Sequence, residues 1–168
     1  MISLPVLREL FDHNYWARDV QLRACKALTT EQLLQPMGGS FGSLRDTLVH
    51  LLGVECLWME RWQGASPKEM LPNDAFPTLE SITVFWQKTE ERMRQMLDAL
   101  DEKVLEQEFT YTNLKGDKLT YPIWRMLVHF LMHQQTHRGQ VNTLLRQLGV
   151  EAVTVDFLKG YDAGYRCE

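Results

Sequence analysis

The sequence predicts an all-α fold, an up-and-down four-helix bundle with a small β-hairpin between the third and fourth helices. Two observations carry this prediction. Four long segments repeat apolar residues at helical spacing, and one short stretch rich in β-branched and aromatic residues interrupts them. The length of 168 residues, of which 45% are hydrophobic, fits a single domain over residues 1–168 with a substantial buried core.

The first half of the chain is expected to hold two long helices. The first covers about 3–27, with a serine as N-cap and a proline tolerated in the first turn. A short helical turn with capping-box spacing follows at 29–32. The second long helix opens at a serine and covers about 43–63, where Gly64 ends it. The connection over 64–77 is longer than most.

The second half predicts the other two helices and the hairpin. An amphipathic helix is expected over about 78–100. The β-rich segments 108–112 and 118–121 flank a Gly-Asp turn and predict the hairpin. The last long helix opens at a proline, covers about 122–148 and stops before a C-capping glycine. The tail over 150–168 has little periodicity and is expected to be irregular.

Composition narrows the function classes. The net charge of -4 and the absence of a basic run disfavour a nucleic-acid partner. No stretch approaches the roughly 18 apolar residues of a membrane span, and the first residues do not resemble a signal peptide. Cys25, Cys56 and Cys167 form no C-x-x-C pair, which is typical of reduced thiols. We therefore expect a cytoplasmic protein with no membrane partner.

The last predicted helix carries three histidines at intervals of four, His129, His133 and His137. With about 100° of rotation per residue, His137 lies roughly 30°, His133 roughly 70° and His129 roughly 110° from the centre of the apolar stripe. His129 and His137 are also about 12 Å apart along the axis, too far to share one ion. His133 and His137 are therefore the candidate metal-binding pair. Gln134 stands where the H-E-x-x-H motif of metalloproteases has its glutamate base, which argues against water activation by such a carboxylate.

A third imidazole comes from the second predicted helix. His50 lies within a broad apolar arc of that helix, so it is expected to face the bundle interior. With His133 and His137 it would complete a three-histidine site inside the bundle. The alternative is that these are ordinary core or surface histidines satisfied by hydrogen bonds. His13 lies in a polar patch of the first helix and is expected at the surface.

The chain resembles the DinB/YfiT-like family of metal-binding four-helix bundles over nearly its whole length. Three segments carry the resemblance: Leu-Phe-Asp-His-Asn-Tyr-Trp-Ala at 10–17, Gly-Ser-Leu-Arg-Asp-Thr-Leu-Val-His at 42–50, and His-Gln-Gln-Thr-His-Arg-Gly-Gln at 133–140. It implies that His50, His133 and His137 are the metal ligands. It also implies a homodimer.

Three neutral imidazoles leave an open coordination position on a divalent ion, for which zinc or nickel is the first expectation and iron or cobalt are also acceptable. Metal ligation lowers the pKa of a thiol or of water and creates a nucleophile near neutral pH. Some relatives use a low-molecular-weight thiol as S-transferases or isomerases. The resemblance therefore implies a metal-dependent enzyme that activates a thiol, or less readily water, against a small-molecule substrate. The alternative is a non-catalytic metal-binding stress-response protein, and no catalytic residue is assigned.

Several residues are expected around the ligands. Glu55 and Gln134 are candidate hydrogen-bond partners for the imidazole N–H groups. In the segment 138–140, the glycine is expected to allow close helix packing, while the arginine and glutamine make polar contacts at the cavity rim. Trp16 and Trp58 are candidate walls of a cavity above the metal, although tryptophans are more often ordinary core residues.

Overall fold

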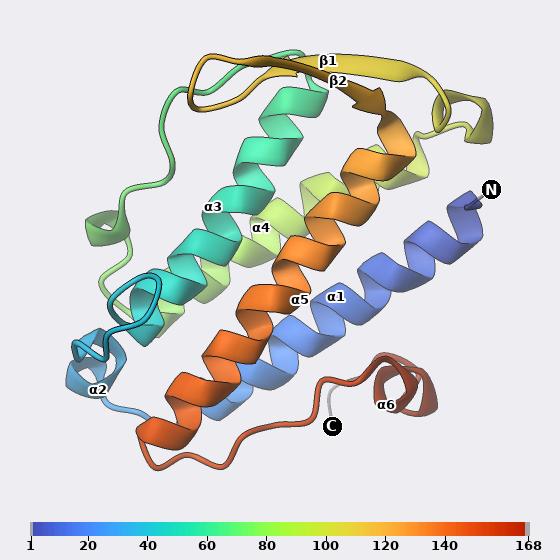
Figure 1. The fold of residues 1–168 in the computed structure, drawn as a ribbon. Helices are drawn as coiled ribbons and strands as arrows, with labels where there is room; N and C mark the ends of the chain where they lie inside the picture. The colour runs from blue at the N-terminus through green and yellow to red at the C-terminus, as the bar shows by residue number, and fades with distance from the viewer. Residues whose placement is uncertain (1, 167–168) are drawn as a thin grey trace.

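Four long helices form the body of the protein, and a two-stranded hairpin lies across one end of them (Figure 1). The computed structural model describes residues 2–166. Its helices and strands are α1 (Leu4–Cys25), α2 (Thr30–Leu34), α3 (Leu44–Trp62), α4 (Leu79–Asp98), β1 (Glu108–Thr112), β2 (Lys118–Pro122), α5 (Ile123–Gln147) and α6 (Phe157–Asp162). Short 3₁₀ turns occupy Asn73–Ala75 and Glu102–Val104. The predicted all-α bundle with a hairpin before its last long helix is confirmed.

Side-chain caps set where three of the helices begin. The Thr29 and Thr78 side chains form capping boxes at the starts of α2 and α4. The Ser43 hydroxyl accepts a hydrogen bond from the backbone N–H of Asp46 at the start of α3. These signals lie in the sequence itself, so the predicted bounds fall within about two residues of the observed ones.

α3 and α4 run in the same direction, which differs from the alternating order of a strictly up-and-down bundle. The N-terminal Ile82 of α4 packs in one cluster with the N-terminal Leu44 of α3, and Leu97 packs with Trp58 at the other end. The connection over 63–78 therefore travels back along the whole bundle. The 19-residue α3 is about 28 Å long, a distance that the connection spans with ease.

The hairpin closes the end of the bundle where α3 ends and α5 begins (Figure 1). Its strands pair antiparallel, with Thr110 opposite Thr120 and their hydroxyls 2.8 Å apart. The Tyr111 ring meets the Trp58 ring of α3 edge to face, with centroids 5.1 Å apart. The hairpin is thereby packed against the C-terminal part of α3.

The tail forms a further helix, α6, where irregular structure was predicted. A helix of six residues is too short to show periodicity, and its docking depends on a tertiary contact. Gly160 packs so closely that an added Cβ would lie 2.9 Å from Cε3 of Trp16 and 3.1 Å from Cδ2 of His13. His13 is therefore half-buried beneath α6, with Nε2 3.0 Å from the Val155 carbonyl oxygen, and not at the surface as predicted. Trp16 packs on this side too, away from the three histidines.

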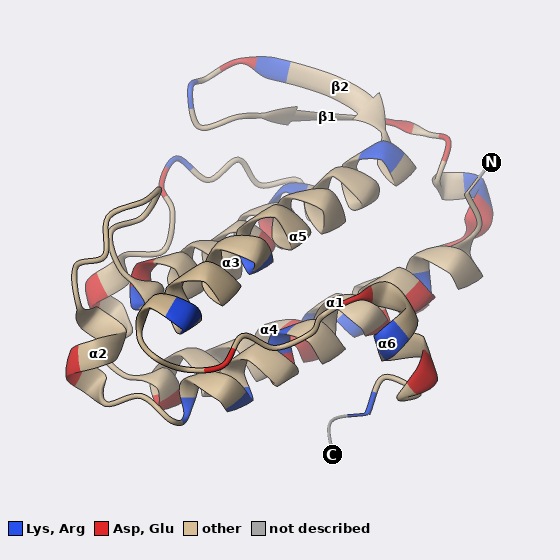
Figure 2. Cartoon of the chain, turned by 60° about the horizontal axis from the view of Figure 1, so that its bottom comes forward, with Lys and Arg blue, Asp and Glu red and all other residues tan. Residues whose placement is uncertain are grey.

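Within residues 2–166, no helix is both long and apolar enough to cross a membrane. Basic and acidic residues are interspersed along the helices and do not form one basic stripe (Figure 2). Cys25 and Cys56 are free thiols, whereas Cys167 lies outside the described residues.

Candidate metal centre

Three imidazoles converge between α3 and α5. The Nε2 atom of His133 lies 3.4 Å from Nε2 of His50 and 3.2 Å from Nε2 of His137. Nitrogens bound at about 2.1 Å to a tetrahedral ion are about 3.4 Å apart. The spacing and the donor set therefore fit a divalent metal ion. Among residues 2–166, no other group of three or more His, Cys, Asp or Glu side chains comes together in this way.

The helices bring these rings together because of residue spacing and one buried hydrogen bond. His133 and His137 are one turn apart on the face of α5 that packs against α3. Gln134 is fully buried, and its Nε2 donates a hydrogen bond of 2.9 Å to the backbone carbonyl of Leu51. That bond fixes the axial position of α5 relative to α3. It joins the residue after His50 to the residue after His133.

Burial keeps two of the imidazoles neutral at neutral pH. The pKa of His50 is lowered to about 4, first by desolvation and then by the neighbouring His137 and His133. The pKa of His133 is lowered to about 4 by desolvation and by His137 and His129. A neutral imidazole has the free lone pair that binds a metal ion, so the two rings are ready to act as ligands without losing a proton first.

Gln140 orients His137. Its Oε1 lies 2.8 Å from Nδ1 of His137, and its Nε2 donates to Oγ of Ser40 at 3.2 Å. Because a carboxamide oxygen only accepts, Nδ1 of His137 carries the proton and Nε2 presents its lone pair to the other two rings. The Nδ1 atom of His133, by contrast, is buried with no hydrogen-bond partner among the described residues. The sequence interpretation placed Gln140 at the cavity rim but assigned it no such partner.

Phe41 covers the cluster on the side of the loop before α3. Its ring stacks on His50 with centroids 4.0 Å apart and meets His137 edge to face at 5.0 Å. The loop can bring this ring so close because Gly39 and Gly42 take positive φ values of 81° and 87°, which favour glycine. Sequence reasoning missed Phe41; a lone aromatic within a glycine- and serine-rich loop was the available signal.

Glu55 and Gln134 were predicted as imidazole partners, and both assignments are wrong. Gln134 bonds to the α3 backbone. Glu55 is fully buried and accepts hydrogen bonds from the Tyr15 hydroxyl at 2.6 Å and from Nε1 of Trp86 at 2.7 Å. Desolvation raises the pKa of Glu55, while these two donors oppose that rise. Glu55 therefore belongs to a buried polar cluster between α1, α3 and α4.

The segment after His137 also differs in part from expectation. Arg138 is 1% exposed and donates to the backbone carbonyl and to Oδ1 of Asn14 at 2.8 and 2.7 Å, so it lies in the core and not at the rim. An added Cβ at Gly139 would meet no atom within 4 Å, so that glycine does not serve close helix packing.

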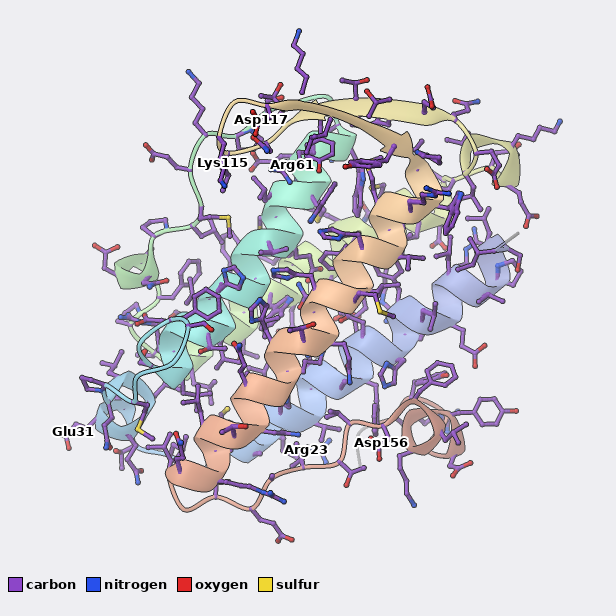
Figure 3. The ribbon with its side chains drawn as sticks, in the orientation of Figure 1. Arg23, Glu31, Arg61, Lys115, Asp117 and Asp156 are labelled. Atoms are coloured by element: carbon purple, nitrogen blue, oxygen red, sulfur yellow. The ribbon has the colours of Figure 1, made fainter. Side chains whose placement is uncertain are left out.

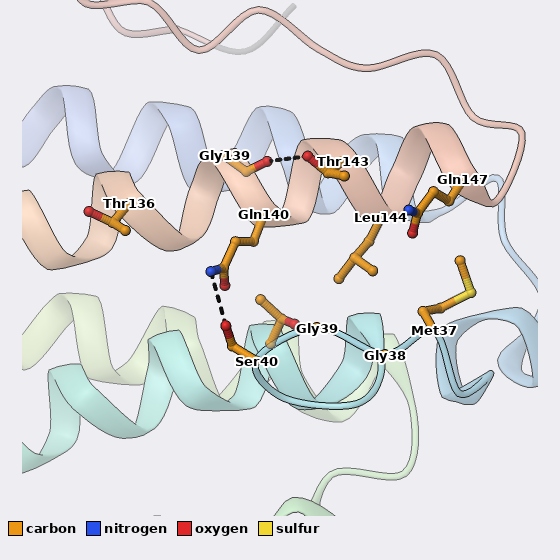
Figure 4. Close-up of a pocket in the computed structure, with 11 residues that line it drawn as sticks. Met37, Gly38, Gly39, Ser40, Thr136, Gly139, Gln140, Thr143, Leu144 and Gln147 are labelled. Atoms are coloured by element: carbon orange, nitrogen blue, oxygen red, sulfur yellow. Dashed lines mark hydrogen bonds between the residues drawn. The ribbon is translucent and has the colours of Figure 1, made fainter.

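A cavity of about 320 Å³ lies beside the part of α5 that follows His137, and Figure 4 shows the residues that line it. We name it the glycine-loop pocket; Gly38, Gly39, Ser40, Gln140 and Thr143 are among its lining residues. Gln140 is thus shared between the pocket and the imidazole cluster. The volume of the pocket is within the roughly 300–1,000 Å³ typical of small-molecule sites.

His129 stays outside the cluster, as the helical rotation predicted. Its side chain is exposed, and its ring centroid lies 6.5 Å from that of His133 and 5.7 Å from that of Trp58. Trp58 therefore borders the approach to the histidines from the hairpin side.

Comparisons with known proteins agree with this architecture. The family model of the DinB family matches residues 3–164. The uncharacterized protein YizA of Bacillus subtilis (strain 168) is 23% identical over 163 residues, covering 90% of this chain and 94% of that protein. Protein DinB of the same strain is 22% identical over 157 residues, covering 89% and 90%. The crystal structure of a DinB-like protein from Bacillus cereus ATCC 10987 superposes with a TM-score of 0.61 at 19% identity, covering 84% of this chain and 92% of that one. The chain belongs to the DinB family.

Proposed function

We propose that the protein is a divalent-metal-dependent enzyme that activates a low-molecular-weight thiol for transfer to a small-molecule substrate. The observation that carries the proposal is the convergence of three imidazole nitrogens, 3.2 and 3.4 Å apart, beside a cavity. Three protein ligands are the number found in catalytic zinc sites, which keep one position for water or substrate.

His50, His133 and His137 would hold the ion, with zinc or nickel as the first choice and iron or cobalt as acceptable alternatives. When bound, the ion supplies the positive charge that lowers the pKa of a coordinated thiol. Gln140 keeps the His137 lone pair directed at the ion. Phe41 shields the rings from bulk water on the loop side.

Thiol activation is favoured over water activation because, among residues 2–166, no carboxylate joins the group formed by the three imidazoles. Glu55 is the buried acid that follows His50 in the same helix, and both of its oxygens are engaged by Tyr15 and Trp86. Hydrolysis at a metal centre usually relies on such a base to take a proton from water. A thiol needs less help, since its pKa lies far below that of water.

The glycine-loop pocket is suited to the body of a polar thiol. Its polar lining atoms include the Gln140 amide and the Ser40 and Thr143 hydroxyls, and no charged side chain lines it. The amide bonds His137 and Ser40 and the Thr143 hydroxyl donates to the Gly139 carbonyl (Figure 4), which leaves their remaining lone pairs and N–H group for a ligand. A thiol with several hydroxyl or amide groups would be held with its sulfur toward His137.

The proposal is tested by following thiol consumption with a chromogenic electrophile in zinc- and nickel-loaded protein. A panel of low-molecular-weight thiols is compared across wild type, His137→Ala and the matched control Gln135→Ala, an exposed position of the same helix. We expect the wild type and the control to accelerate the reaction and His137→Ala to lose the acceleration. Equal rates in all three would support the alternative, a non-catalytic metal-binding protein.

Two further proposals remain: the family resemblance supports a homodimer, and the cysteine pattern of the sequence supports a cytoplasmic location. Light scattering of the purified chain distinguishes a dimer from a 19.7 kDa monomer.

A further inference from the structure

A second cavity, of about 450 Å³, lies between the hairpin and the groove of α3 and α5. We name it the hairpin pocket. Its walls are largely aromatic, and its lining includes Trp58, Tyr111, Tyr121, Arg125 and His129. The pocket differs in chemistry from the glycine-loop pocket, which has no aromatic residue in its lining.

The two pockets lie on opposite sides of the three histidines. His129, in the hairpin pocket, precedes His133 by one helical turn, about 5.4 Å along the axis. Gln140, in the glycine-loop pocket, follows His137 by nearly one turn. Along α5 the order is therefore hairpin pocket, imidazole cluster, glycine-loop pocket. Each pocket thus has a lining residue about one turn from a candidate ligand, His129 on one side and Gln140 on the other.

An arginine without an acidic partner lies behind the aromatic wall. The Arg61 guanidinium stands 4.9 Å from the centroid of the Trp58 ring and 4.6 Å from that of Tyr111. The residue is 5% exposed, its buried Nε has no hydrogen-bond partner, and it makes no ion pair with any described acid. Figure 3 shows Arg61 near the end of α3, beneath the hairpin. A buried cation without an anion is costly, and aromatic faces offset only part of that cost.

Another guanidinium lines the hairpin pocket itself. Arg125, in the first turn of α5, is exposed and stacks on the Trp124 ring at 5.2 Å. It too forms no ion pair with any acid in the described part of the chain. Guanidinium groups pair with planar carboxylates through two parallel hydrogen bonds, and aromatic walls favour a flat apolar body.

We propose that the hairpin pocket binds an aromatic carboxylate, which is the second substrate of the enzyme. Its role as a substrate rests on the proposed function, whereas the binding of the carboxylate does not. Its carboxylate pairs with Arg125 and draws on the positive charge of Arg61. Its ring packs among Trp58, Tyr111 and Tyr121, and its far end reaches past His129 toward His133.

The first test uses 2-naphthoate as the probe and 2-naphthamide as its neutral isostere. Calorimetric titration of the metal-free protein should show naphthoate binding at least about tenfold more tightly than naphthamide. Arg125→Gln should abolish that preference, and the matched control Arg146→Gln, at the other end of α5 and outside the hairpin pocket, should keep it. Equal affinity for the two probes, or an unchanged preference in Arg125→Gln, would overturn the proposal.

The second test places the bound probe. In NMR spectra, the naphthoate proton signals should broaden far more with cobalt-loaded than with zinc-loaded protein. The unpaired electrons of cobalt broaden the signals of nearby protons, and the pocket residue His129 lies only one helical turn, about 5.4 Å along the axis, from His133. Binding without this difference would contradict a ligand whose far end reaches toward His133. The two proposals fail separately: an inactive protein that still prefers naphthoate refutes only the thiol chemistry, and an active protein without that preference refutes only the pocket.

Discussion

Oε1 of Gln140 accepts a hydrogen bond from Nδ1 of His137 at 2.8 Å, and the same side chain reaches Ser40 in the glycine loop. One glutamine thus sets the tautomer of a candidate ligand and also lines the pocket beside it. The spacing of three residues on one helix makes the contact possible.

Replacement of Gln140 tests that role. Gln140→Leu should weaken zinc binding about tenfold or more, because partners that orient a ligand typically contribute 10–100-fold to metal affinity. Competition against a chromogenic chelator measures the change. Gln147→Leu is the control, since Gln147 lines the same pocket but makes no contact with an imidazole. A similar loss in both variants would mean that the pocket wall, and not the hydrogen bond, matters.

The stability of the metal-free protein should depend on pH through His50 and His133. Each has a folded-state pKa of about 4, lowered from the ordinary histidine value of 6.5. Above pH 6.5 both states are neutral and there is no effect. Between pH 6.5 and 4 the unfolded state binds protons that the folded state does not, so the free energy of unfolding falls as the pH falls.

Urea unfolding at pH 7 and pH 5 checks this dependence. The midpoint should drop at pH 5 in the wild type, and it should drop less in His50→Leu, which has one such group fewer. Added zinc should raise the urea midpoint more at pH 7 than at pH 5, because protons compete with the ion for the imidazoles. An identical drop of the urea midpoint between pH 7 and pH 5 in wild type and variant would contradict the assigned pKa shift.

The docking of α6 on α1 should be sensitive to one methyl group. Gly160→Ala places a Cβ 2.9 Å from Trp16, so we expect a loss of about 1–3 kcal/mol in the stability of this contact. Gly139→Ala is the matched control, since its Cβ would meet open space and helical alanine is roughly 0.5–1 kcal/mol better than glycine. Thermal unfolding followed by tryptophan fluorescence compares the two; a destabilised Gly139→Ala with an unaffected Gly160→Ala would refute the packing.

The sequence predicted the helices, the hairpin and the histidine pair because those features are local. Capping residues and apolar periodicity mark each helix, and the four-residue spacing puts His133 and His137 on one face. The parallel course of α3 and α4 was not predictable in this way, since helix bounds are the same for either order. Only the length of the connection over 63–78 hinted at it.

The partners of the imidazoles were harder to predict, although rotation contained part of the answer. Glu55 follows His50 by five residues, which turns it about 140° away from the histidine and toward Tyr15. Gln140 follows His137 by three and therefore shares its face. Phe41 meets His137 from a segment distant in the sequence, so its glycine- and serine-rich loop did not reveal which imidazoles it contacts.

Metal content measured after purification without a histidine tag tests the central claim most directly. We expect close to one divalent ion per chain in the wild type and in His129→Ala, whose imidazole lies outside the cluster. His50→Ala, His133→Ala and His137→Ala should each lose the stoichiometric ion while circular dichroism shows an intact helical fold. Stoichiometric metal retained in His50→Ala, or lost from His129→Ala, would contradict the three-histidine site.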